Sequence, residues 1–265
     1  AIYRGREDFV YRITIGETPF ITSIFPLGGR ANSPTTIDIS GWNLPTRRIT
    51  LGNKDAETGI YPLRVRKENH VSNEVPFAVD ALPEILDQES GQAKPGAVRV
   101  TLPVIVNGRI ERQDDADTFA FEGRAGQQIV AEVMARRLHS PLDSTLQLLG
   151  PDGAEVAFND DSADRGAGLT THHADSYLSV ALPKDGTYQI KLRDTQHRGG
   201  HDNAYRLRIS PPMPDFALRV VPSSISARAG ASAPVTVFAL RKDGFGGEIK
   251  ISLKNAPEGF RLSGD

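Results

Sequence analysis

The chain has 265 residues, and its 31 lysines and arginines nearly balance its 33 aspartates and glutamates, which leaves a formal net charge of −2. This balance predicts no nucleic-acid partner, because a phosphate-binding surface requires clustered basic residues in excess. The sequence contains no cysteine, which excludes disulfides and a cysteine nucleophile. No apolar run approaches the ~20 residues of a membrane span, so we expect no membrane-spanning segment. The length predicts about two domains.

Glycine and proline, with 25 and 18 residues, divide the chain into short segments. These segments are rich in β-branched and aromatic residues, and their apolar positions alternate with polar ones. Alternation with a period of two is typical of half-buried strands, and short strands between frequent turns are typical of sandwiches. The sequence therefore predicts an all-β protein built from tandem β-sandwiches.

A repeat links the start of the chain to its middle. Residues 4–16, RGREDFVYRITIG, align with residues 198–210, RGGHDNAYRLRIS, at a constant offset of 194 (198 − 4). Self-similarity at a fixed spacing indicates an array of related domains. We therefore expect residues 1–16 to be the last strand of a truncated preceding copy. Residues 214–265 are expected to form a partial immunoglobulin-like domain, because they carry too few strand patterns to close a sandwich.

Residues 18–80 contain several alternating segments and are expected to form one domain. The stretches Pro19–Ile21, Phe25–Gly29 and Ile39–Leu44 resemble the TIG/IPT branch of the immunoglobulin-like domains. The resemblance implies an immunoglobulin-like β-sandwich. Trp42, the only tryptophan, is either part of a ligand platform or a partly buried anchor of its turn. We favour the anchor, because a lone aromatic ring makes a poor sugar platform.

Residues 81–97 are acidic and then small and polar, and we expect them to be a linker. Residues 98–210 contain about nine strand-like segments at the spacing of a sandwich. The runs QDDADTFAFEGRAGQQIVAEV, STLQLLGPDGAEVAFNDD and LPKDGTYQIKL follow one another in this domain. They resemble the bacterial pre-peptidase C-terminal (PPC) domain. The resemblance implies a jelly-roll-type β-sandwich that is non-catalytic and accompanies secreted peptidases and other surface proteins.

The stretch Asn107–Phe121 joins an acidic corner to an alternating strand. Asp114, Asp115 and Asp117 lie in the corner, and the two phenylalanines after it are two residues apart, on one face of a strand. The corner has two interpretations. Aspartate favours solvated turns, but a loop with several carboxylates is also what Ca²⁺ prefers as a ligand.

The PPC resemblance implies further ligands for calcium at this corner. In the collagen-binding modules of bacterial collagenases, calcium lies between an acidic linker and the carboxylates of the corner. The matching positions here are Asp114 and Asp117 of the corner with Glu84, Asp87 and Glu89 of the linker. The sequence departs from the family pattern after Glu89, where Ser-Gly stands in place of Pro-Asn. Calcium is thus an expected cofactor, and a solvated acidic linker facing an acidic turn is the alternative.

A second acidic stretch, Asn159, Asp160, Asp161 and Asp164, is a weaker calcium candidate. It is similar to an EF-hand loop only in part. With Asp160 at the first position, the glycine falls one place late, and a threonine stands where a bidentate glutamate is needed. We favour a polar hairpin loop here.

The histidines His172, His173, His197 and His201 are candidate zinc ligands. Zinc needs three or four ligands that converge tetrahedrally. The two glycines between His197 and His201 indicate a loop, so we favour structural or exposed histidines. The sequence contains no GxSxG elbow, P-loop or HExxH motif that would indicate catalysis.

These patterns predict a non-catalytic accessory region of a larger secreted, periplasmic or cell-surface bacterial protein. Its expected role is spacing, adhesion or substrate targeting, with calcium as a stiffening ligand. Its expected partners are neighbouring domains and extracellular polysaccharide or protein. One alternative is a carbohydrate- or collagen-binding module, which requires an exposed row of aromatic rings. Another is a hydrolase, which requires a deep cleft with converging carboxylates or histidines.

Overall fold

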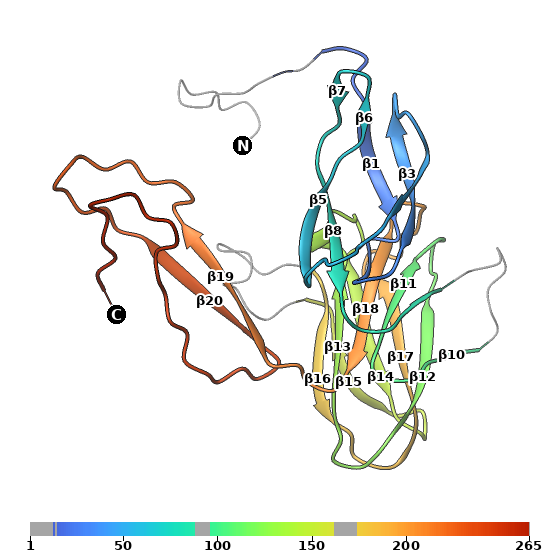
Figure 1. Cartoon of the computed structure of the whole chain (residues 1–265). Helices are drawn as coiled ribbons and strands as arrows, with labels where there is room; N and C mark the ends of the chain where they lie inside the picture. Colours follow the sequence, from blue (N-terminus) through green and yellow to red (C-terminus); the bar gives the residue numbers. More distant parts are fainter. Residues whose placement is uncertain (1–12, 14, 88–95, 162–173, 265) are drawn as a thin grey trace, which may run out of the picture. The chain divides into compact units, whose positions relative to one another are not determined.

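The computed structural model describes residues 13, 15–87, 96–161 and 174–264. The chain divides into two compact units, residues 1–211 and residues 212–265. Strands dominate the first unit (Figure 1), and the described part of the second contains one pair of strands. The described residues include one short 3-10 helix, η1 (Arg136–Leu138). The all-β prediction is therefore confirmed. None of the described helical structure is long and apolar enough to cross a membrane. The truncated strand expected at residues 1–16 lies almost entirely outside the described residues.

The first sandwich comprises the strands between residues 20 and 80. Its strands are β1 (Phe20–Phe25), β2 (Gly28–Arg30), β3 (Thr35–Trp42), β4 (Arg48–Leu51), β5 (Gly59–Leu63), β6 (Arg66–Lys67), β7 (His70–Val71) and β8 (Val75–Asp80). One sheet has the order β1-β3-β4 and another the order β2-β8-β5. Ile21, Ile37 and Phe77 from these sheets are buried in one core. Alternate residues of β3 point into this core, as the period of two predicts.

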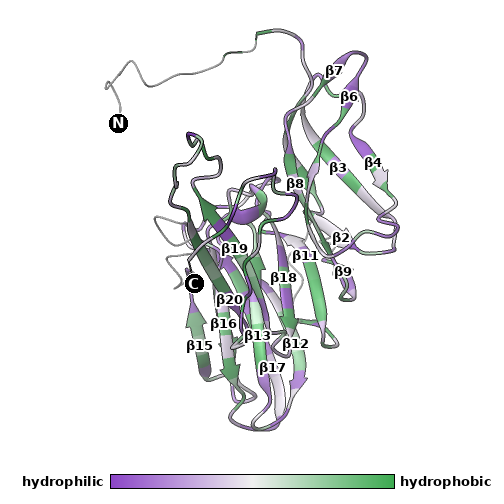
Figure 2. Cartoon of the chain, turned by 60° about the vertical axis from the view of Figure 1, so that its left-hand side comes forward, coloured by the Kyte–Doolittle hydropathy of each residue, from purple (hydrophilic) through white to green (hydrophobic). Residues whose placement is uncertain are grey.

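The second sandwich comprises two five-stranded sheets. Its strands are β10 (Val98–Arg99), β11 (Val104–Arg109), β12 (Asp117–Gly123), β13 (Gln128–Met134), β14 (Ser144–Leu149), β15 (Glu155–Asn159), β16 (Tyr177–Ala181), β17 (Gly186–Asp194) and β18 (Ala204–Ser210). The sheet orders are β10-β12-β17-β14-β15 and β16-β13-β18-β11-β9, where β9 is Glu84–Leu86. Hydrophobic residues run along strands such as β11 (Figure 2). They meet in a core where the rings of Phe121 and Tyr188 stack with their centroids 5.8 Å apart.

The segment expected to be a linker contains a strand. Glu84–Leu86 forms β9, which pairs in parallel with β11 and lies beside it in Figure 2. The backbone amide of Ile105 donates to the carbonyl of Pro83, and the amide of Asp87 donates to the carbonyl of Asn107. These bonds hold the acidic half of the segment against the second sandwich. Residues 88–95 lie outside the described residues.

The acidic corner leads into β12 as predicted. Phe119 and Phe121 are 0% and 2% exposed, and both pack in the core of the second sandwich. Asp117, the first residue of β12, is buried and accepts a hydrogen bond from the hydroxyl of Tyr205 at 2.5 Å. Tyr205 lies opposite Gly108 on β11, and a Cβ at Gly108 would fall 2.2 Å from that hydroxyl. Only glycine leaves room there for the Tyr205–Asp117 hydrogen bond.

The second unit, residues 212–265, contains an antiparallel pair of strands, β19 (Asp215–Val221) and β20 (Thr236–Lys242). Asp243 after β20 accepts a hydrogen bond from the backbone amide of Met213, and the rings of Phe216 and Phe245 lie 5.1 Å apart. Most residues of β19 are exposed, apolar ones included.

We expect Tyr205→Phe to lower the free energy of unfolding by about 1–3 kcal/mol, because it removes a buried hydrogen bond to an aspartate. Tyr61→Phe is the matched control, since the Tyr61 hydroxyl donates to the carbonyl of Glu57 at an exposed site. The control should stay within about 0.5 kcal/mol of the wild type. Urea denaturation followed by circular dichroism measures both, and equal effects would contradict the buried role of Tyr205.

Candidate functional site

The junction between the first and second sandwiches contains a buried ion pair. Arg206 of β18 donates from Nη2 to the carboxylate of Glu84 at 2.7 Å and from Nη1 to the side-chain oxygen of Asn107 at 2.8 Å. The side chains of Arg206 and Glu84 are 3% and 13% exposed. Asn107 also donates to Glu84 at 3.0 Å. Such nearly complete burial of two charged side chains is tolerated because each charge is both paired and hydrogen-bonded.

The first sandwich closes over this ion pair. A Cβ at Gly28 of β2 would lie 2.8 Å from the guanidinium carbon of Arg206 and 2.2 Å from the carbonyl oxygen of Ala78. Glycine at this position lets the backbone of the first sandwich approach the ion pair closely. Arg206 therefore touches the first sandwich, the segment between the sandwiches and the second sandwich.

The two sandwiches also share apolar packing and hydrogen bonds. Leu138 of η1 and Ala204 of β18 are 2% and 1% exposed, and both belong to the core of the first sandwich. Ser23 donates to Asp202 at 2.5 Å, and the hydroxyl of Ser40 lies 3.2 Å from Nε2 of His201. This packing of second-sandwich residues in the core of the first restricts hinge motion, since bending would expose apolar surface.

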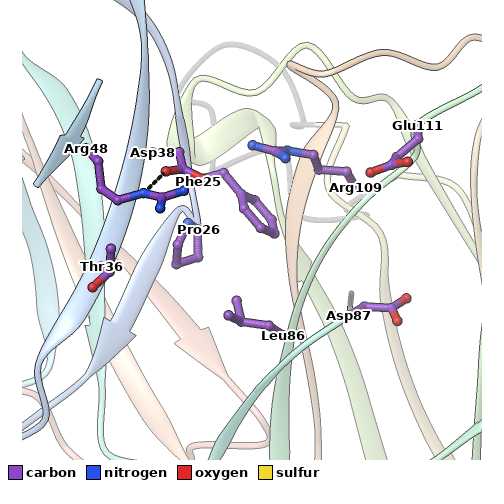
Figure 3. A pocket seen from close by; sticks show the side chains of 9 residues that line it. All are labelled: Phe25, Pro26, Thr36, Asp38, Arg48, Leu86, Asp87, Arg109 and Glu111. Atoms are coloured by element: carbon purple, nitrogen blue, oxygen red, sulfur yellow. Dashed lines mark hydrogen bonds and ion pairs between the residues drawn. The ribbon is translucent and has the colours of Figure 1, made fainter. Parts of the chain in front are cut away.

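A pocket of about 450 Å³ opens at the same junction (Figure 3). The first sandwich contributes Phe25, Pro26, Thr36, Asp38 and Arg48, and the other side contributes Leu86, Asp87, Arg109 and Glu111. Its volume lies within the usual range for small-ligand sites, roughly 300–1,000 Å³. The lining combines charges of both signs with a small apolar surface.

Arg109, the last residue of β11, is the central cation of the pocket. Its guanidinium lies over the ring of Phe25, with 3.8 Å between the guanidinium carbon and the ring centroid. Its Nε is buried and has no hydrogen-bond partner among the described residues. Burial lowers the pKa of Arg109, against the attraction of Glu111 and Asp38. Even a lowered arginine pKa leaves the group charged at neutral pH.

Asp38 and Arg48 form an ion pair on the opposite side of the pocket, with 2.6 Å between Nε and Oδ1 (Figure 3). The hydrogen bond from Arg48 lowers the pKa of Asp38 below its ordinary value. A lowered folded-state pKa means that the contribution of Asp38 to stability is present above the ordinary aspartate pKa and is lost as the pH falls through the lowered value. Asp38 therefore stays ionised at neutral pH.

The structure gives the predicted calcium ligands other partners. Asp114 is exposed and lies 2.9 Å from Nδ1 of His197, whereas Asp117 is buried beside Tyr205. Glu84 pairs with Arg206, and Asp87 lines the pocket. Over the described ranges, no three His, Asp or Glu side chains cluster as metal ligands do. Glu89 lies outside those ranges, so a calcium site that includes it stays a prediction.

The second calcium candidate is only partly described. Asn159 ends β15, and its side-chain oxygen accepts a hydrogen bond from the backbone amide of Tyr177 at 2.8 Å. Asp160 and Asp161 follow it, and Asp164 lies outside the described residues. The histidines at 172 and 173 also lie outside them.

Asp175 is a buried group with a structural role. It is fully buried and accepts hydrogen bonds from the backbone amides of Ala135, Arg136 and Arg137 and from the Arg137 side chain. Burial opposes the charged form of Arg137, but Glu132 and Asp175 outweigh it and raise the pKa of Arg137. These contacts fix η1, which supplies Leu138 to the junction.

Sequence analysis also missed Arg109 and Arg206, the two arginines of the junction. The available signal was a basic residue within or at the end of an apolar strand: Arg109 ends β11, and Arg206 is the third residue of β18. The signal is weak alone, because such arginines are usually exposed.

A family model for the bacterial pre-peptidase C-terminal domain matches residues 115–194, from the acidic corner to the end of β17. This part of the chain is a PPC domain. A probable subtilase-type serine protease of Deinococcus radiodurans is 38% identical over 79 residues, which are 29% of this chain and 10% of that protein. The chain thus spans about 10% of the length of that relative.

Two solved structures align with part of the chain. The pre-peptidase C-terminal domain of a collagenase from Bacillus anthracis aligns with 16% identity and a TM-score of 0.34, over 45% of this chain and 100% of that one. PliG of Aeromonas hydrophila, a periplasmic inhibitor of g-type lysozyme, aligns with 17% identity and a TM-score of 0.31, over 48% of this chain and 95% of that one. The PPC prediction is confirmed for residues 115–194, and the TIG/IPT resemblance of the first sandwich stays a prediction.

We expect Arg206→Met to lower the free energy of unfolding by about 3–5 kcal/mol, because it leaves Glu84 buried without its cation. In a Glu84→Gln background, Arg206→Met should lower the free energy of unfolding by at least about 1 kcal/mol less than in the wild type. This difference is the interaction energy expected of two residues in contact. Denaturant unfolding of the four proteins of this double-mutant cycle measures the coupling.

Arg64→Met is the matched control, since Arg64 pairs with Glu74 at 2.8 Å on the surface, with side chains 54% and 49% exposed. Its cost should stay within about 1 kcal/mol. Additive effects at Arg206 and Glu84 would contradict the buried ion pair.

Proposed function

We propose that this chain is a non-catalytic accessory region of a larger secreted or cell-surface bacterial protein, in which the two sandwiches of unit 1 act as one rigid targeting arm. The match of residues 115–194 to the PPC family carries the proposal. PPC domains are non-catalytic regions that accompany peptidases, and the matching relative is a probable serine protease. The parent activity proposed here is accordingly proteolysis by a neighbouring domain.

Rigidity supports a targeting role over a simple tether. The ion pair of Glu84 and Arg206 and the shared packing of Leu138 tie the two sandwiches together. A binding surface on a rigid arm holds its ligand at a defined place relative to the adjoining domain, which raises the effective concentration of substrate there.

The ionisation of Asp38 in the pocket supports binding rather than hydrolysis. Asp38 has a lowered pKa because Arg48 donates to it, so it is ionised at neutral pH and is a poor general acid. A hydrolase built on paired carboxylates needs one of them protonated.

An exposed aromatic pair favours a second candidate function, carbohydrate binding. Trp42 is 65% exposed rather than the partly buried anchor expected from the sequence, and its ring centroid lies 5.9 Å from that of Phe20, which is 46% exposed. Trp42 is exposed because β3 alternates, and its side chain falls on the face opposite Ile39 and the core. The two exposed rings are tilted by 36° to each other and present adjacent apolar faces on which a sugar ring can stack.

We expect the full chain, fused to a fluorescent protein, to be retained on insoluble protein such as casein beads but not on cellulose or chitin. We also expect the chain alone to release no fluorescence from labelled casein. Co-sedimentation and a fluorogenic assay measure these properties. Proteolysis by the repurified chain would overturn the proposal.

Retention on polysaccharide would favour the second candidate if Trp42→Ala abolishes it. Phe158→Ala is the matched control, because Phe158 is an exposed aromatic residue, 53% exposed, on β15 of the second sandwich. Loss in the Trp42 variant alone identifies the Phe20–Trp42 pair as the sugar site.

A further inference from the structure

The junction pocket holds a cation whose hydrogen bonding is incomplete. Nε of Arg109 is buried and finds no acceptor in the part of the chain that the structure describes. A buried donor left without an acceptor costs stability. The ring of Phe25 offsets part of this cost through its face, 3.8 Å from the guanidinium carbon, but it supplies no acceptor oxygen. Arg109 also lines the pocket, where its guanidinium can meet an anion that enters.

One of the carboxylates that attract Arg109 is already engaged in an ion pair. Asp38 accepts a hydrogen bond from Arg48 at 2.6 Å, and its attraction on Arg109 acts through space. Figure 3 shows the guanidinium of Arg109 directed toward the side of Asp38 and Phe25, with Glu111 and Asp87 on the other side of the pocket. The lining thus offers a cation between two separate acidic regions.

The remaining lining is apolar and accessible. Pro26 and Leu86 lie below Arg109 in Figure 3, and Leu86 is 46% exposed. A ligand that fills this pocket needs a carboxylate for Arg109, an apolar group for Pro26 and Leu86, and a cationic group for Glu111. A peptide supplies all three from neighbouring side chains, whereas an acidic polysaccharide supplies only the carboxylate.

We propose that the pocket binds a peptide segment in which an acidic side chain pairs with Arg109, an apolar side chain packs on Pro26 and Leu86, and a basic side chain faces Glu111. Arginine suits this task because its planar fork binds a carboxylate through two parallel hydrogen bonds. The inference rests on the proposed function, because the pocket exists only while the two sandwiches stay docked. It adds a location and a ligand class to the targeting role.

The test uses the full chain and fluorescein-labelled hexapeptides that carry one leucine, one glutamate and one lysine among glycines and serines. Fluorescence polarisation at low salt should show saturable binding. Replacement of the glutamate by glutamine in the peptide, or Arg109→Gln in the protein, should each weaken binding about tenfold, the value of a charged hydrogen-bonded pair. The two changes together should cost little more than either alone, because they remove the same interaction.

Arg99→Gln is the control, since Arg99 of β10 is exposed, with its side chain at 80% exposure, and lies outside the pocket lining. It should bind the peptides like the wild type. Arg109→Lys keeps the positive charge but loses the planar guanidinium. This variant should bind the peptides more weakly than the wild type and more tightly than Arg109→Gln. Thermal unfolding of each variant establishes that it folds.

Three results would overturn the proposal: equal binding by Arg109→Gln and Arg99→Gln, equal binding of the glutamate and glutamine peptides, or tighter Arg109-dependent binding of an acidic oligosaccharide such as oligogalacturonate. The last result would assign the pocket to polysaccharide. If peptides fail to bind while the Arg206–Glu84 coupling is intact, the peptide site fails and the rigid arm stands. If that coupling is absent, the rigid arm itself fails.

Discussion

The buried ion pair between Glu84 and Arg206 is the constraint on which the architecture of unit 1 depends. Two charges removed from water are stable only while their geometry is kept. If the strand that carries Glu84 separated from Arg206 of β18, each residue would be left as a charge without its partner. Gly28 extends this constraint to the first sandwich, since its backbone lies against the same guanidinium. One arginine therefore couples a PPC domain to the sandwich before it, and the acidic segment between them becomes part of the structure.

This coupling gives the junction its chemical character. Arg109 lies one strand away from Arg206, at the end of β11, where the docking of the first sandwich covers it with Phe25. Docking desolvates the guanidinium and at the same time leaves its Nε without an acceptor in the described chain. A desolvated arginine with an unpaired Nε arises here between two domains, because Phe25 of one sandwich covers Arg109 of the other. The targeting role and the peptide site thus have one physical origin.

Local sequence patterns predicted the strands well and the junction poorly. Alternation identified β12, whose Phe119 and Phe121 lie in the core, because a period of two depends only on neighbouring residues. The same reasoning assigned Glu84 to a linker, since an acidic three-residue strand has no period of its own, and its parallel partner β11 lies about 20 residues on. The corner carboxylates were grouped as calcium ligands because they are aspartates close in sequence and because the segment resembles the PPC family. Their partners, such as Tyr205 for Asp117, come from strands far away in sequence, where spacing carries no information.

Hydrogen exchange in increasing urea, followed by mass spectrometry on the full chain, tests the central claim that the two sandwiches of unit 1 open together. The account predicts that peptides from β3 in the first sandwich and from β13 in the second lose protection with the same free energy of opening and the same dependence on urea. Loss of protection in β3 at distinctly lower urea, while β13 stays protected, would contradict it. In that case the ion pair at Arg206 would be a contact between independent domains.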